Sequence, residues 1–149
     1  KDAVFAALIA DLHEDLYRAS GNTAHSFADQ PLQALTEANR GYITSYFENR
    51  DVMRAFIEAA GVDEDYRRIW WDMRNRHVRR FPAALSKDHG IEEIGGVPAA
   101  TVAEALSCMV EQACYVWFAQ EAMDERRISI EDATTTLSNA WYAAVFRSG

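Results

Sequence analysis

The sequence has little of what marks membrane proteins, turn-rich β proteins and nucleic-acid-binding proteins. Of its 149 residues only 3 are proline and 7 are glycine, too few for a turn-rich β-sandwich or a collagen-like chain. No apolar run approaches the roughly 18 residues that a membrane span needs. Acidic residues outnumber basic ones by 23 to 15, for a net charge of −8. A chain this acidic repels phosphate backbones and anionic lipids, so by itself it should bind neither DNA nor a membrane.

The residues that are present fit one globular domain spanning 1–149. A hydrophobic fraction of 49% and a charged fraction of 26% are typical of a folded chain with one core. The only two cysteines, Cys108 and Cys114, are six positions apart, which on a helix turns their side chains about 120° from each other. We therefore predict two buried free thiols and a reducing, cytoplasmic location.

Helical periodicity dominates the chain and predicts an all-α bundle of about six helices. Pro31 suits the first turn of a helix, Asp51 can cap the next one, and Ser129 can open the last with a capping box. Pro82 should kink the fourth helix. Residues 87–96 are predicted to be a loop, and no strand is expected. The predicted helices cover residues 2–20, 31–49, 51–61, 63–85, 98–126 and 129–147.

Sequence motifs of enzymes are missing. The chain has no glycine-rich phosphate loop and no His-Glu-x-x-His, none of its four histidines lies in a Glu-x-x-His pair, and the cysteine spacing does not fit zinc. We expect no metal, no cofactor and no catalytic site. A Ser/His/Asp or Cys/His site leaves no such pattern because its members meet only in space. A helical-bundle enzyme acting on a hydrophobic small molecule therefore stays as an alternative.

The segment 66–81 carries six arginines against the single acid Asp72. We interpret these arginines as a solvated face rather than a nucleic-acid patch. Trp70, Arg74, His77 and Phe81 follow one another on one helical stripe. Either the two rings face the core while the polar heads reach outward, or the stripe is the wall of a ligand cavity with polar handles.

Two helices carry an unusual amount of apolar or small surface. Residues 102–119 hold only two charges, Glu104 and Glu111, and the last helix pairs an apolar stripe with a face of small residues. Both helices are either central in a monomer or half of a four-helix bundle between two subunits, and we favour the homodimer. Such an interface should bury roughly 1,500–2,000 Å² in total.

The carboxylate of Glu111 lies in an apolar helix, so it should need a partner if it is buried. Arg74 or His77 could supply the positive charge across the bundle. Replacing Glu111 with Gln should leave stability nearly intact if the group is instead solvated at an interface edge. His13 and His25 are expected to face water.

These residues together resemble the TetR family of transcriptional regulators. Residues 1–8, KDAVFAAL, resemble the segment that opens the fourth helix of that family, directly after its DNA-recognition helix. Residues 37–50 and 64–85 are similar to its fifth and seventh helices. Residues 109–118 and 141–146 are similar to its eighth and ninth helices, which form the dimer bundle. The N-terminal helix-turn-helix of the family has no counterpart here, and the first residue is Lys1 rather than Met, so we expect a fragment or trimmed chain.

The resemblance implies the effector-binding and dimerisation domain of a repressor, with DNA bound only through an N-terminal domain. It implies a cavity framed by the first, second, fourth and fifth helices, which takes a small, mostly apolar or aromatic effector. Arg74 and His77 would suit a carboxylate or phenol on that effector. A dimeric interaction module without a cavity is a third alternative. By position, the implied ligand-binding residues are Tyr46, Phe47, Trp70, Arg74, His77, Ser107, Glu111, Tyr115 and Trp141.

Overall fold

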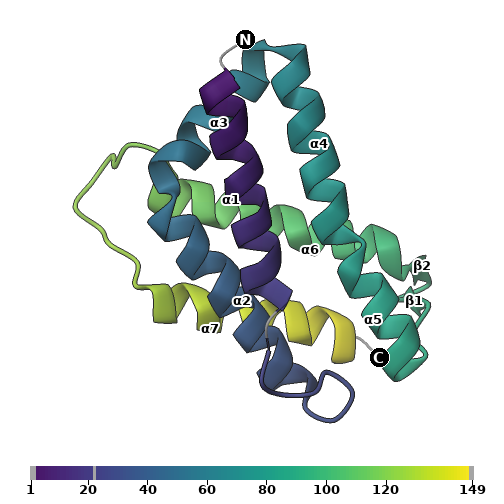
Figure 1. Cartoon of the computed structure of the whole chain (residues 1–149). Coiled ribbons are helices and arrows are strands. Elements are labelled where there is room, and N and C mark those ends of the chain that lie inside the picture. The colour runs from purple at the N-terminus through teal and green to yellow at the C-terminus, as the bar shows by residue number, and fades with distance from the viewer. Residues whose placement is uncertain (1–2, 22, 148–149) are drawn as a thin grey trace.

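The computed structural model of the chain describes residues 3–21 and 23–147. Within these ranges the protein is an all-α bundle, as the sequence predicts, with seven α-helices, one short π-helix and one small hairpin (Figure 1). The α-helices are α1 (Ala3–Gly21), α2 (Pro31–Glu48), α3 (Arg50–Val62), α4 (Glu64–Val78), α5 (Arg80–His89), α6 (Ala99–Cys114) and α7 (Ile130–Phe146). No helix in the described ranges has both the length and the apolar character that crossing a bilayer requires.

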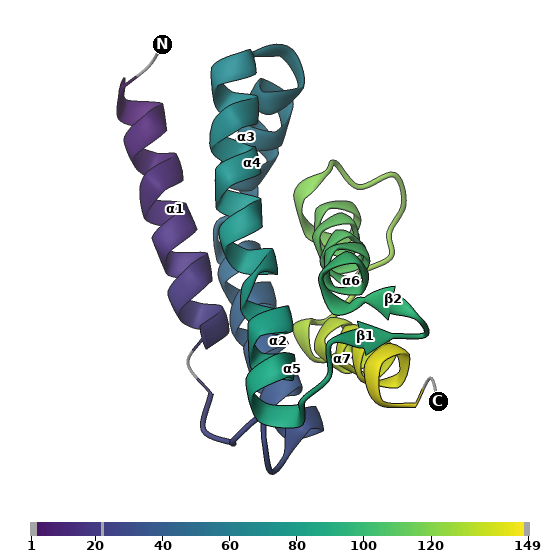
Figure 2. The ribbon, with the colours of Figure 1, turned by 90° about the vertical axis from the view of Figure 1, so that its right-hand side faces the viewer.

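The helices form three layers (Figure 2). α1 lies on one side, α2 to α5 form the middle layer, and α6 and α7 lie together on the opposite side. α2 is the central element, because it packs extensively against α1 in one direction and α7 in the other. Its buried Ile43 and Tyr46 join Leu16 of α1 and Leu137 of α7 in one hydrophobic core. These residues are buried because each helix turns its apolar stripe toward the neighbouring helices.

The predicted fourth helix is two helices. α4 begins after Asp63, whose carboxylate accepts hydrogen bonds from the backbone N–H groups of Asp65 and Tyr66, and it ends at Val78. α5 then runs from Arg80 to His89. Pro82 lacks the N–H that would donate to the carbonyl of residue 78, four positions earlier, so the α-helical ladder is interrupted there rather than only kinked.

Residues 87–96 do not form the predicted loop throughout. α5 continues to His89, and two short antiparallel strands follow, β1 (Glu93–Ile94) and β2 (Val97–Pro98). Gly95 and Gly96 connect the strands with φ of 61° and 79°. Two successive residues of positive φ make the tight turn that suits a two-residue hairpin, and only glycine adopts it without strain. The Gly-Gly pair was the signal for this hairpin, which the sequence prediction missed.

Three helix ends also differ from the prediction. Asn49, not Asp51, is the residue that precedes α3, and α3 continues through the predicted terminator, Gly61, to Val62. α6 passes into the π-helix η1 (Tyr115–Ala119) and stops there instead of reaching residue 126. The charged segment that follows Ala119 has no apolar stripe to bury, so tertiary packing does not hold it in a helix. The cap of α7 is confirmed, since the Ser129 hydroxyl accepts from the N–H of Asp132.

Candidate functional site

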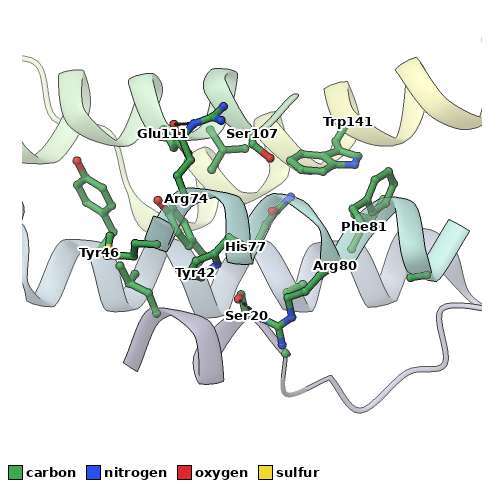
Figure 3. Close-up of a pocket in the computed structure, with 18 of the residues that line it drawn as sticks. Ser20, Tyr42, Tyr46, Arg74, His77, Arg80, Phe81, Ser107, Glu111 and Trp141 are labelled. Carbon is green, nitrogen blue, oxygen red and sulfur yellow. Dashed lines mark hydrogen bonds and ion pairs between the residues drawn. The ribbon is translucent and has the colours of Figure 1, made fainter. Parts of the chain in front are cut away.

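A cavity of about 370 Å³ lies inside the bundle, lined by residues from all seven α-helices and from the loop between α1 and α2 (Figure 3). Small-molecule sites occupy roughly 300–1,000 Å³. The interior around Trp70 is therefore not solidly packed, which disagrees with an interaction module that lacks a cavity. Most of the wall is apolar, formed chiefly by Leu16, Phe27, Leu35, Met53, Ile57, Met73, Phe81 and Val110.

The cavity brings together most of the residues that the resemblance singled out. Seven of the nine line it: Tyr46, Trp70, Arg74, His77, Ser107, Glu111 and Trp141. Helices 1, 2, 4 and 5 of the sequence prediction all contribute, α7 contributes the expected Trp141, and α3 adds a wall that was not expected.

Phe47 and Tyr115 do not belong to the cavity wall. Phe47 follows Tyr46 by one position, which turns it about 100° around α2, and its ring lies 5.4 Å from that of Phe118. Tyr115 is the first residue of the π-helix. Ser107 and Glu111 are four positions apart on α6 and both face the cavity. The wider π turn that begins at Tyr115 interrupts this spacing, so Tyr115 does not continue the cavity-facing row.

The stripe on α4 forms a wall of the cavity, as one of its two interpretations supposed. Trp70, Arg74 and His77 all line the cavity, and Phe81 continues the wall on α5. Trp71 points elsewhere and is 51% exposed, as the 100° step between neighbours requires. The stripe therefore supplies large rings and polar groups to one hollow.

Arg74 is fully committed to partners on α6. Its Nε lies 3.1 Å from Oε2 of Glu111, and its Nη2 donates to the carbonyl of Glu104 and to Sγ of Cys108. Of the two cations proposed for Glu111, Arg74 is therefore the partner. Burial raises the pKa of the Glu111 carboxyl, and the Arg74 charge opposes that rise. Cys108 is exposed rather than buried as predicted, whereas Cys114 is buried, and both are free thiols.

His77 lies in a cage of aromatic rings. Its ring meets those of His13, Tyr17 and Tyr42 edge-on, with centroids 5.4–5.9 Å apart. Burial, together with the nearby cations, lowers the pKa of His77 to about 4, so the imidazole is neutral at pH 7.

His13 belongs to this cluster. The prediction that it faces water is wrong. It is half-buried on α1, and its Nε2 lies 2.9 Å from Nη1 of Arg76. Burial lowers the pKa of His13, and the Arg76 charge lowers it further. His25 is exposed as expected, although its ring lies 3.0 Å from the Glu37 carboxylate.

Three polar atoms in the cavity wall have no hydrogen-bond partner among the described residues. They are the Tyr46 hydroxyl, Nε2 of His77 and Nε1 of Trp141. They belong to cavity-lining residues of α2, α4 and α7, and each of the three atoms is itself buried. Buried polar atoms normally have partners, and a bound molecule could supply them here.

The fold and the cavity agree with one family comparison. The model of the family described as the C-terminal domain of the transcriptional regulator EthR matches residues 35–147. The chain belongs to this family. It is therefore the C-terminal, regulatory domain of a TetR-family regulator, the kind of domain that binds ligands and dimerises. No curated protein and no solved structure gave a significant match.

This EthR-type domain also has a cavity residue that the sequence analysis did not single out, Arg80. The basic segment 66–81 predicts a solvated position for Arg80, but this residue is half-buried and lines the cavity. Its Nη1 donates to the Tyr17 carbonyl at 2.6 Å and to Oγ of Ser20 at 2.9 Å. Arg80 lies three positions after His77, and this spacing was the available signal that both share a helical face.

Proposed function

We propose that this domain senses a small, mostly apolar effector for a TetR-type repressor, and that the effector binds in the cavity between the helices. The observation that carries the proposal is a mostly apolar cavity, three of whose lining residues hold a polar atom with no hydrogen-bond partner within the described residues. Apolar surface supplies most of the binding free energy of a small molecule, and a few fixed polar groups orient it. No catalytic role is proposed for any cavity residue.

In this proposal the effector acts on DNA binding through α1. α1 contributes Leu16, Ser20 and Gly21 to the cavity wall, so a ligand contacts the helix directly. By the resemblance, this helix follows the DNA reader. A ligand that binds one position of α1 better than another shifts the population of the two, and with it the spacing of the readers in a dimer.

We propose further that the outer face of α6 and α7 is the homodimer interface. Figure 2 shows the two helices side by side on one side of the molecule. Their solvent-exposed positions are mostly small and uncharged, among them Ala105, Cys108, Thr136 and Ala140. Small uncharged residues let helices from two subunits approach closely and bury their apolar neighbours.

Native mass spectrometry of protein purified from cells tests the proposal, because it reports subunit number and any retained small molecule together. A matched pair of variants separates the cavity from the surface: Ala84→Phe fills the cavity wall, and Ala83→Phe adds the same ring at the exposed neighbouring position. We expect Ala83→Phe to retain ligand like the wild type and Ala84→Phe to lose it. Equal retention by both variants would place the ligand elsewhere and refute the proposal.

A further inference from the structure

We infer that Arg80 binds the anionic head of the effector, which is an amphipathic monocarboxylate with its apolar body in the cavity. This inference rests on the proposed function and adds the chemical class of the ligand. It moves the expected carboxylate contact from Arg74 and His77 to a residue one turn further along the chain.

Arg80 is a cation whose hydrogen bonds within the described residues all go to neutral acceptors. Within the described residues it has no ion pair with a carboxylate, and its two acceptors are a backbone carbonyl and a hydroxyl. Both bonds use Nη1, and within residues 3–21 and 23–147 neither Nε nor Nη2 donates a hydrogen bond. A guanidinium presents these donors side by side, in the geometry that a carboxylate accepts as a bidentate pair.

The other two polar candidates in the cavity are unsuited to an anion. The charge of Arg74 is balanced by Glu111 at 3.1 Å, with the Glu104 carboxylate a further 3.7 Å contact. His77 is neutral at pH 7 because its pKa is about 4. One unbalanced cation in the wall predicts one negative charge on the ligand.

A second cation, Arg76, lies close to Arg80. The guanidinium groups of Arg76 and Arg80 each lie 3.8 Å from the centroid of the Tyr17 ring. Glu14 pairs with Arg76 at 2.6 Å, which leaves the charge of Arg80 unmatched. The Arg76 charge and, above all, burial lower the pKa of Arg80. A bound anion would stabilise the charged form of Arg80 against both effects.

The apolar body of the ligand has a surface beside this cation. Phe81 and Ala84 on α5 and Phe27 in the loop line the cavity together with Arg80. In Figure 3 the Arg80 side chain extends toward Ser20, and the Phe81 ring lies beside that of Trp141. A carboxylate on Arg80 would leave the rest of the molecule against these rings.

The same contact would act on α1. Arg80 holds the last turn of α1 through Tyr17 and Ser20, and a carboxylate on Nε and Nη2 leaves these bonds in place. By neutralising the repulsion between Arg76 and Arg80, the anion should tighten the junction of α1 with α4 and α5. Hydrogen exchange in the last turn of α1 should therefore slow when the carboxylate binds.

Matched ligand pairs test the inference by isothermal titration calorimetry: decanoate against decanamide, and phenylbutyrate against phenylbutyramide. Each pair keeps the apolar body and removes only the charge. We expect the wild type to bind the carboxylate roughly tenfold or more tightly than the amide, the effect of a charge-assisted bond. Arg80→Gln should abolish this preference. The control Arg79→Gln removes the same charge from an exposed neighbour whose Nε donates only to the Asn75 carbonyl, and it should keep the preference.

A second variant tests Arg80 without changing its charge, in case Arg80→Gln does not fold. A Cβ on Gly21 would lie 1.8 Å from Nη2 of Arg80, so Gly21→Ala must displace the guanidinium. We expect Gly21→Ala to lower the ratio of carboxylate affinity to amide affinity below that of the wild type.

The outcomes separate this inference from the proposed function. If the amides bind as tightly as the carboxylates, or if Arg80→Gln keeps the preference, Arg80 is not the anion site, while the cavity remains an effector site. If neither member of either pair binds, the proposed function and this inference both fail. Faster exchange in the last turn of α1 on carboxylate binding would overturn the tightening of that junction.

Discussion

Replacing His77 with Phe should reduce the acid sensitivity of this domain. His77 is held among the rings of His13, Tyr17 and Tyr42, and its Nε2 has no partner within the described residues. Protonating this imidazole would place a buried positive charge near Arg76 and Arg80, which also lower its pKa. Phenylalanine keeps a flat ring for the edge contacts and cannot take up a proton.

The magnitude follows from the two pKa values of His77. The pKa is 6.5 for an unperturbed histidine and about 4 in the folded protein, so the unfolded chain binds more protons between these values. Stability is therefore fully present above about pH 6.5 and falls as the pH drops toward 4. The two values predict a loss of about 2 kcal/mol between pH 7 and pH 5. Half-burial of the ring makes this figure an upper limit.

Urea denaturation at pH 7 and at pH 5 measures this loss directly. The wild type should lose about 2 kcal/mol more stability than His77→Phe between the two conditions. Carboxyl groups titrate in both proteins, so their contribution cancels in the comparison. The control is His25→Gln, a change at an exposed histidine, which should keep the wild-type loss. An equal loss in the wild type and in His77→Phe would refute the assignment of the acid sensitivity to this ring.

Two more predictions concern the packing of α1 and the dimer face. Gly41→Ala should destabilise the fold by roughly 1–3 kcal/mol, because its Cβ would lie 2.1 Å from the Ala19 carbonyl oxygen of α1. Gly61→Ala, with no atom within 4 Å of the new Cβ, should be neutral or stabilising, and equal thermal melting of the two variants would contradict this packing argument. Ala140→Arg on the exposed face of α7 should give a monomer in light scattering, whereas Ala83→Arg on α5 should stay dimeric; a dimeric Ala140→Arg would move the interface elsewhere.

Local sequence signals predict where several helices begin. Pro31 opens α2 and Ser129 caps α7, as predicted, and α4 begins within one residue of its predicted start, with Asp63 as its N-cap. Each signal acts within one turn of its own residue, so no distant part of the chain is needed to interpret it. Helix ends are harder to predict from the sequence. The predicted helix runs to residue 126, whereas α6 and the π-helix that continues it end at Ala119. A helix end depends on whether neighbouring elements bury the next turn.

The cavity could be predicted only in part. Periodicity places Trp70, Arg74 and His77 on one face of α4, and the structure confirms that they share a wall. Periodicity does not say what lies opposite that face, so the partners of Arg74 on α6 came from the structure, with only Glu111 anticipated. Phe47 and Tyr115 lie outside the wall because of the way their helices are rotated about their own axes. The sequence pattern does not determine this rotation.

The sequence by itself determined the helical class, most of the helix starts and the resemblance to a regulator domain, because these depend on residue order within a few turns. Tertiary structure alone decided which charges are balanced. Arg74 and Arg80 are six positions apart in the same basic segment, yet α6 brings carboxylates to Arg74, while the described residues of α1 bring Arg80 a carbonyl, a hydroxyl and the Tyr17 ring but no carboxylate. The chemistry of a charged side chain is set by the groups packed around it, and those groups come from helices distant in the chain.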